Sequence, residues 1–196
     1  MRTSSKVKQL ALFASGTGSN VRNIHSFFSQ RPDVHIAVLV CNKKDAPVVS
    51  FARDQNISVR LIDKATLYDS EMLTDELKAM DIDLIVLAGF LWLIPQHLIV
   101  GFPNRIINLH PALLPKYGGK GMYGKKVHEA VLENGDKESG ITIHLVNGRY
   151  DEGDILFQAT CPVDKKDDVE RLSQKIHQLE HEHLPILIDQ LLSQIV

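Results

Sequence analysis

Short apolar segments that alternate with helix-like segments constrain the fold of this chain more than any other feature. Five of them have the length of a strand and are apolar on both faces, which is typical of a parallel sheet covered by helices on both sides. These segments are residues 10–14, 36–40, 58–62, 84–88 and 106–109. Helical spacing or helix start signals occur between them, in residues 20–29, 46–55, 69–80 and 95–100. The alternation predicts a doubly wound, Rossmann-like α/β architecture.

The rest of the chain has a different pattern. Residues 125–133 have helical spacing, and the strand-like residues 141–146 and 155–162 flank a polar turn, which predicts an antiparallel pair. Residues 167–194 are one long amphipathic segment, in which we expect Pro185 to kink or divide the helix. Because the sequence contains no repeat, low-complexity tract or linker, we expect one domain over residues 1–196.

Charge and cysteine content argue against several classes of protein. With 22 Lys+Arg and 24 Asp+Glu the net charge is −2, without the basic excess that binds nucleic acid. No apolar run approaches the ~20 residues of a membrane span, and residues 1–9 lack the apolar segment of a leader. Cys41 and Cys161 adjoin apolar runs, as reduced core thiols do. We therefore expect a cytoplasmic protein that binds neither nucleic acid nor membranes.

A glycine-containing loop follows the first predicted strand and opens a helix. In residues 15–20, SGTGSN, the amides of Gly18 and Ser19 can surround an anion, and Asn20 can cap the helix or add a polar contact. A dinucleotide fingerprint needs a glycine where Val21 stands, and no Gly-Lys-Ser/Thr of a P-loop occurs. We expect the loop to hold a single phosphate, such as that of a sugar phosphate; the alternative is a plain strand-to-helix turn.

Two polar residues end the fifth predicted strand, in residues 106–111, IINLHP. Asn108 and His110 are two apart and so share a face of the strand. Together an amide donor and an imidazole could stabilise an oxyanion or exchange a proton, although a core asparagine beside a surface histidine is the plainer alternative. A carboxylate from the turn at residues 150–154 would raise the pKa of His110. By spacing alone Asp151, Glu152 and Asp154 suit this role equally.

A pattern in the last predicted helix is similar to a zinc motif. His177, Glu180 and His181 match the His-x-x-Glu-His of inverted zinc peptidases. The pattern is short, His183 follows on another face and Pro185 lies just beyond. We therefore expect no metal site, and a helix face that meets solvent or substrate.

Three motifs, in their order and spacing, resemble the glycinamide ribonucleotide formyltransferases. They are SGTGSN at residues 15–20, NLHPALLP at 108–115, and GITIH at 140–144 followed by YDEGDILFQ at 150–158. The resemblance extends from about Gln9 to Leu192. It implies the formyltransferase fold, a doubly wound, mostly parallel sheet with helices on both faces and an antiparallel C-terminal strand pair. The implied reaction transfers the formyl group of 10-formyltetrahydrofolate to the amine of glycinamide ribonucleotide in de novo purine biosynthesis.

The resemblance also implies roles for individual residues. The catalytic set is Asn108, protonated His110 and Asp151, with Asp151 holding the imidazolium and ordering a water. Residues that bind the ribonucleotide are Thr17, Gly18, Ser19, Asn20 and Glu180. Residues that bind the folate are Leu91, Trp92, Leu93, Ile94, Asn147, Gly148, Arg149 and Tyr150. The chain departs from the family in having Trp92 where many relatives carry a basic residue, and no arginine among residues 67–72. A long, glycine-rich loop at residues 116–126 is expected to be a mobile cover.

Three other readings share parts of these motifs. A formyltetrahydrofolate hydrolase usually carries an N-terminal regulatory domain, for which the early first strand leaves no room. A methionyl-tRNA formyltransferase needs a C-terminal RNA-binding domain and a basic surface. A binding protein that has lost activity would not need Asn108, His110 and Asp151 together. The expected ligands are thus the ribonucleotide and the folate co-substrate, without a metal, bound by a monomer or weak homodimer.

Overall fold

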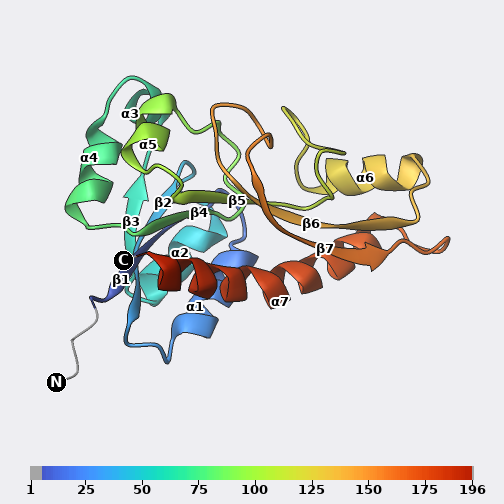
Figure 1. Cartoon of the computed structure of the whole chain (residues 1–196), viewed down its shortest axis with the longest axis horizontal. Helices are drawn as coiled ribbons and strands as arrows, with labels where there is room; N and C mark the ends of the chain where they lie inside the picture. The colour runs from blue at the N-terminus through green and yellow to red at the C-terminus, as the bar shows by residue number, and fades with distance from the viewer. Residues whose placement is uncertain (1–5, 196) are drawn as a thin grey trace.

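The computed structural model describes residues 6–195 and contains a seven-stranded sheet (Figure 1). Met1–Ser5 and Val196 lie outside the described residues, so the expectation of a domain over 1–196 is tested at neither end. The strand order is β3-β2-β1-β4-β5-β6-β7. The strands are β1 (Lys8–Phe13), β2 (Val34–Cys41), β3 (Ser58–Leu61), β4 (Leu84–Leu87), β5 (Ile106–His110), β6 (Glu138–Leu145) and β7 (Ile155–Pro162).

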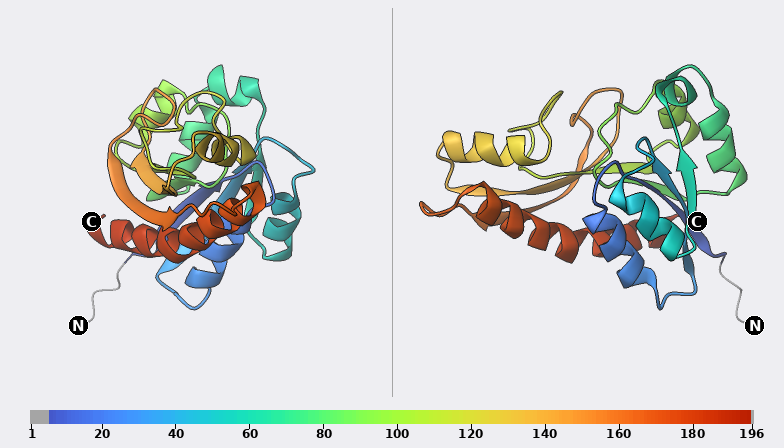
Figure 2. Two further views of the ribbon diagram at one scale, coloured as in Figure 1. Left: turned by 90° about the vertical axis from the view of Figure 1, so that its right-hand side faces the viewer. Right: turned by 180° about the vertical axis from the view of Figure 1, so that it is seen from behind.

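The direction of the strands confirms the predicted doubly wound, mostly parallel sheet. Strands β1 to β5 pair in parallel, whereas β6 is antiparallel to both β5 and β7. Figure 2 shows that β6, β7 and α6 (Lys125–Glu133) extend to one side of the parallel strands. From β1 the chain extends the sheet on one side, through β2 and β3, and then returns to the other side of β1 to form β4. Open α/β sheets bind ligands at such a switch in strand order.

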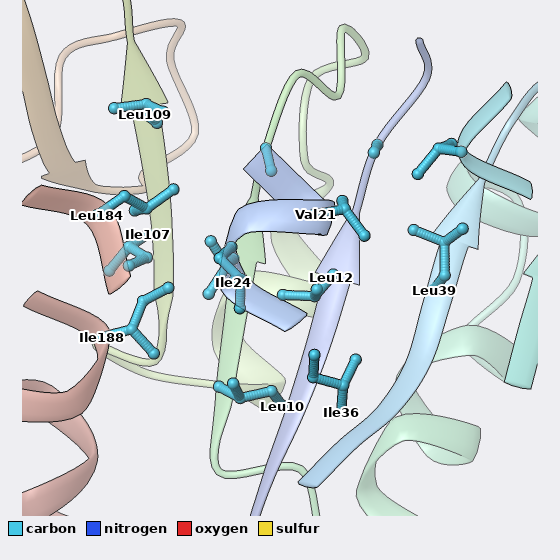
Figure 3. Packing of buried hydrophobic residues seen from close by; sticks show 14 of the residues in the cluster. Leu10, Leu12, Val21, Ile24, Ile36, Leu39, Ile107, Leu109, Leu184 and Ile188 are labelled. Carbon is cyan, nitrogen blue, oxygen red and sulfur yellow. The ribbon is translucent and has the colours of Figure 1, made fainter. Parts of the chain in front are cut away.

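Helices cover both faces of the sheet because the central strands are apolar on both sides. Leu10 and Leu12 of β1 pack into one buried cluster, while Ala11 and Phe13 pack into the other. Figure 3 shows the first cluster, in which Leu12 lies near side chains of α1 and β2. The helices of this layer are α1 (Ser19–Phe28), α2 (Pro47–Asp54) and α7 (Val169–Gln194). Those of the opposite layer are α3 (Lys64–Tyr68), α4 (Met72–Ala79) and α5 (Gln96–Gly101).

The helix expected over residues 69–80 is confirmed as α4, and a shorter helix that the sequence pattern did not predict, α3, precedes it. Helix α3 begins earlier, after Asp63, whose carboxylate accepts a hydrogen bond from the Thr66 amide at 2.7 Å. This cap starts a short helix that ends at Tyr68, and α4 begins only at Met72.

Pro185 does not divide the last helix, which runs continuously from Val169 to Gln194. A proline removes one helical hydrogen bond and leaves the carbonyl four residues earlier without its usual donor. Here that carbonyl belongs to His181, and it accepts a hydrogen bond from Asn23 Nδ2 of α1 at 2.8 Å. Burial of Leu184 and Pro185 against the sheet further holds the helix in place.

Thr142 of β6 fixes the segment that follows β5. Its fully buried hydroxyl donates to Ala112 O at 2.7 Å and accepts from the Leu114 amide at 3.0 Å and from Gln158 Nε2 at 2.8 Å. We expect Thr142→Val to lower the free energy of unfolding by about 2 kcal/mol, because buried polar groups lose their partner. Chemical denaturation measures this. Exposed Thr160 on β7 is the matched control, and equal losses in Thr142→Val and Thr160→Val would contradict the account.

Among the helices formed by residues 6–195, none combines the length and the apolar character needed to cross a membrane.

Candidate functional site

A cleft of about 760 Å³ opens at the carboxyl ends of β1, β4 and β5. The glycine loop after β1, the segment after β4 and the end of β5 line it, together with the β6–β7 connection and one face of α7. All three predicted catalytic residues and all five predicted ribonucleotide contacts lie on its wall. The cleft thus lies at the edge of the sheet where the sequence predicts a ligand site.

Asn108, His110 and Asp151 meet at the centre of the cleft. The two β5 residues point to the same side of the strand, as predicted, and Asp151 approaches them from the β6–β7 connection. Asn108 Nδ2 donates to Asp151 Oδ1 at 3.2 Å, and His110 Nδ1 lies 3.5 Å from Asp151 Oδ2. The carboxylate thus contacts both partners, one with each oxygen.

Of the three acidic residues in the turn, Asp151 is the one whose side chain reaches β5. Sequence spacing alone could not distinguish it from Glu152 and Asp154. Its backbone has a φ of +57°, a left-handed conformation that directs the side chain into the cleft. Glu152 instead pairs with Arg149 at 3.0 Å, and within the described chain neither Glu152 nor Asp154 lines the cleft.

The loop between β5 and α6 contacts both His110 and Asp151. His110 Nε2 donates to the carbonyl oxygen of Tyr117 at 2.8 Å, so this nitrogen carries a proton. The amide of Gly119 donates to Asp151 Oδ2 at 2.9 Å. Residues of this loop also line the cleft, whereas its role as a mobile cover stays a prediction.

From the sequence we expect a carboxylate to raise the pKa of His110, but its pKa is lower than usual in the structure. Burial lowers the pKa of His110, whose side chain is almost fully enclosed, and this outweighs the upward effects of Asp151 and of Tyr117. Burial raises the pKa of Asp151, but His144, His110 and the Gly119 amide together hold it below its usual value. The free protein therefore pairs a neutral imidazole with a charged carboxylate at neutral pH.

The glycine loop approaches α2 so closely that only glycine fits. Gly18 has a φ of +76°, and a Cβ there would come within 2.7 Å of Val48 Cβ. The N-cap of α1 is Gly18, without a side-chain cap, so of the two roles expected for Asn20 the structure shows the polar contact and not the cap. Asn20 lies inside the first turn and instead donates its amide to Glu180 Oε2 at 3.0 Å.

Glu180 reaches the glycine loop from α7 and is only 6% exposed. Burial raises its pKa, against the opposing effects of the Asn20 amide and of His177, whose Nε2 lies 4.0 Å away. A carboxylate held in this way accepts hydrogen bonds, which suits ligand hydroxyl groups beside a phosphate. In residues 6–195 no group of three His, Cys, Asp or Glu side chains is placed to hold a metal ion.

The residues expected to contact folate lie in the segment after β4 and in the β6–β7 connection. All of them line the cleft except Gly148, which among the described residues is not part of the wall. Half-buried Trp92 packs edge-on against Phe90, with ring centroids 6.1 Å apart, and lies 6.4 Å from Tyr68. Tyr68 also donates its hydroxyl to Leu93 O at 3.1 Å, which ties α3 to this segment.

The sequence reading missed His144 as a member of the centre. His144 pairs with Asn108 across β5 and β6, and its Nε2 lies 3.1 Å from Asn108 Nδ2. Its Nδ1 donates to Leu145 O at 2.7 Å, which leaves Nε2 to accept from the asparagine amide. His144 is the last residue of the GITIH motif at residues 140–144, but only the register of β5 and β6 places it beside Asn108.

Comparisons with known proteins agree on one kind of relative. A family model described as formyl transferase matches residues 8–188. The chain is 46% identical to the chloroplastic phosphoribosylglycinamide formyltransferase of Arabidopsis thaliana over 180 residues, 89% of this chain and 62% of that protein. It therefore spans less than two thirds of the length of this plant relative.

Two bacterial relatives match over almost their full length. Identity to the phosphoribosylglycinamide formyltransferase of Bacillus subtilis is 34%, over 95% of each chain. The crystal structure of glycinamide ribonucleotide transformylase 1 from Geobacillus kaustophilus is similar, with a TM-score of 0.83 and 34% identity. That match covers 95% of this chain and 99% of the other.

Proposed function

The chain belongs to the formyl transferase family, and we propose that it transfers the formyl group of 10-formyltetrahydrofolate to the amine of phosphoribosylglycinamide. The products are formylglycinamide ribonucleotide and tetrahydrofolate, in de novo purine biosynthesis. The observation that carries this proposal is one cleft that joins a glycine loop to the cluster of Asn108, His110 and Asp151. Bacterial relatives matched over nearly their whole length support the same acceptor.

In this proposal each end of the cleft holds one substrate. Thr17, Gly18, Ser19 and Asn20 surround the phosphate of the ribonucleotide, since free amides and the positive end of α1 attract an anion. The Glu180 carboxylate accepts hydrogen bonds from the ribose hydroxyls. At the other end the pterin lies against residues 91–94 and the start of the β6–β7 connection.

The formyl carbon then lies beside Asn108 and His110. The amine attacks this carbon, and negative charge develops on the formyl oxygen, to which an Asn108 N–H donates. Both N–H groups of Asn108 are engaged by His144 and Asp151 in the free protein, so the formyl oxygen takes the place of one of them. This exchange allows an Asn108 N–H to donate to the formyl oxygen as negative charge develops on it.

His110 moves the proton from the attacking amine to the leaving nitrogen of the folate. Nε2 is engaged with Tyr117 O, so Nδ1 is the nitrogen that accepts the proton, directly or through a water. The imidazolium that forms lies 3.5 Å from the Asp151 carboxylate, which stabilises its charge. The tetrahedral intermediate collapses, N10 of the folate takes the proton, and His110 returns to its neutral form.

The direct test follows tetrahydrofolate formation from 10-formyltetrahydrofolate in the presence and absence of phosphoribosylglycinamide. The proposal predicts formation only when the ribonucleotide is present. Equal rates without it, with formate released, would identify a hydrolase instead.

The pH dependence of kcat/KM follows from the His110 environment. Neutral His110 is the active form, and its pKa lies below 6.5, so we expect kcat/KM to fall only as the pH drops through a value below 6.5. Because Asp151 raises this pKa, residual activity in Asp151→Asn should have its acid limb at still lower pH. A pH–rate profile measures both; an acid limb centred above 6.5 in the wild type contradicts this account.

Trp92, the one tryptophan of the chain, reports on the folate end of the cleft. We expect 10-formyltetrahydrofolate to change its fluorescence emission, and phosphoribosylglycinamide alone to leave it unchanged. Trp92→Ala should raise KM for the folate about 10-fold through lost aromatic contact, with KM for the ribonucleotide unaffected. An unchanged folate KM in this variant would remove Trp92 from the folate site.

The proposal also includes a cytoplasmic location and a monomer or weak homodimer. Within the described chain Cys41 and Cys161 are free thiols, as a reducing compartment requires.

Sedimentation equilibrium at low concentration should give a mass near 22.0 kDa, that of one chain. A stable larger assembly at that concentration would contradict the proposal of a monomer or weak homodimer.

A further inference from the structure

His128 of α6 is a buried polar side chain in the cleft wall that the reaction described above does not use. Its side chain is only 3% exposed, and it lines the cleft. Its Nδ1 is buried and has no hydrogen-bond partner among residues 6–195. A buried polar atom without a partner is uncommon in native proteins and calls for a specific explanation, of which a bound ligand is one.

The two ring nitrogens have different surroundings, and this difference fixes the proton. Burial lowers the pKa of His128 to about 4, so the ring is neutral at physiological pH and carries one proton. A proton on Nδ1 would be an N–H donor sealed away from any acceptor, which is the costlier arrangement. The proton therefore belongs on Nε2, and His128 presents a neutral N–H donor to the cleft.

The position of His128 selects which part of a substrate it meets. Helix α6 packs against α7. His128 lines the same cleft as His177 and Glu180 of α7 and as His110 of β5. A ribonucleotide bound from the glycine loop to His110 passes this point with the segment that joins its ribose to its amine.

We propose that Nε2–H of His128 donates a hydrogen bond to the amide carbonyl oxygen of the glycinamide arm. The ribose hydroxyls are donors to the Glu180 carboxylate, and the amide carbonyl is the strongest acceptor between phosphate and amine. His128 would then distinguish the glycinamide arm from a bare sugar phosphate. This inference rests on the proposed function, because it assumes phosphoribosylglycinamide as the ligand.

The test compares the affinity of His128 variants for two ligands by calorimetric titration. Phosphoribosylglycinamide carries the amide carbonyl, and ribose 5-phosphate lacks it. His128→Phe keeps a planar ring without a donor, and we expect its Kd for phosphoribosylglycinamide to rise about 10-fold with Kd for ribose 5-phosphate unchanged. His128→Gln keeps an N–H donor, and its loss should be smaller.

Ser139→Ala is the matched control. Ser139 is 2% exposed, its Oγ likewise has no partner in the described chain, and it lines a separate cavity of about 350 Å³. Both affinities should stay unchanged in this variant. If His128→Phe bound phosphoribosylglycinamide as tightly as the wild type, or lost equal affinity for both ligands, the role of His128 would be contradicted and the proposed function would stand. A wild-type protein that does not bind phosphoribosylglycinamide would overturn both the role of His128 and the proposed function.

Discussion

Replacing Asp151 by asparagine is expected to lower kcat by about 10³-fold while the protein stays folded. Asparagine keeps the size of the side chain but removes the negative charge that faces His110 Nδ1 at 3.5 Å. It also replaces one acceptor oxygen with an N–H group, opposite the donors Asn108 Nδ2 and the Gly119 amide. The imidazolium formed during proton transfer would then lack its stabilising partner.

Single-turnover kinetics with both substrates saturating measures this loss without interference from product release. Asp154→Asn is the matched control, since Asp154 lies in the same turn, is exposed, and is not part of the cleft wall within residues 6–195. Its kcat should equal that of the wild type. A kcat in Asp151→Asn within a few-fold of the wild type would mean that Asp151 has no part in the proton transfer.

Asn108→Ala is expected to lower kcat by about 10²- to 10³-fold, the cost of losing one oxyanion donor. The effect should fall on kcat rather than on either KM, because the bond to the formyl oxygen strengthens only as charge develops there. The substitution also leaves His144 Nε2 without the 3.1 Å amide donor, so far-UV circular dichroism must accompany the kinetics.

Asn134→Ala serves as the control, because Asn134 follows α6, its side-chain amide donates to Asp136 Oδ1 at 2.8 Å, and within residues 6–195 it is not part of the cleft wall. We expect wild-type kinetics from it. If Asn108→Ala raised KM without changing kcat, Asn108 would bind the ground state and transition state equally, and the oxyanion role would be wrong.

The parallel part of the fold could be predicted because its signal is local. Strands that are buried on both faces must be apolar throughout, as Leu10 to Phe13 are, and the periodicity then changes in the segments between. The position of the cleft follows from the same reasoning, since the carboxyl ends of parallel strands meet at one edge. Asn108 and His110 were predictable as neighbours because strand geometry alone places them on one face.

Features that depend on tertiary contacts could not be read in this way. The choice of Asp151 over Glu152 and Asp154 depends on a left-handed backbone within the turn, and the role of His144 on strand register. The continuity of α7 at Pro185 depends on a hydrogen bond from Asn23, over 150 residues away. The direction of the His110 pKa depends on how much burial opposes the carboxylate, which no motif encodes.

The most direct test of the central claim follows the formyl group itself. The wild-type protein is incubated with 10-formyltetrahydrofolate labelled in the formyl carbon and with phosphoribosylglycinamide, and the labelled products are separated and identified by mass. The account predicts that the label appears on the amine of the ribonucleotide, with one tetrahydrofolate formed for each formyl group transferred. Label recovered as formate, at a rate that the ribonucleotide does not change, would contradict it.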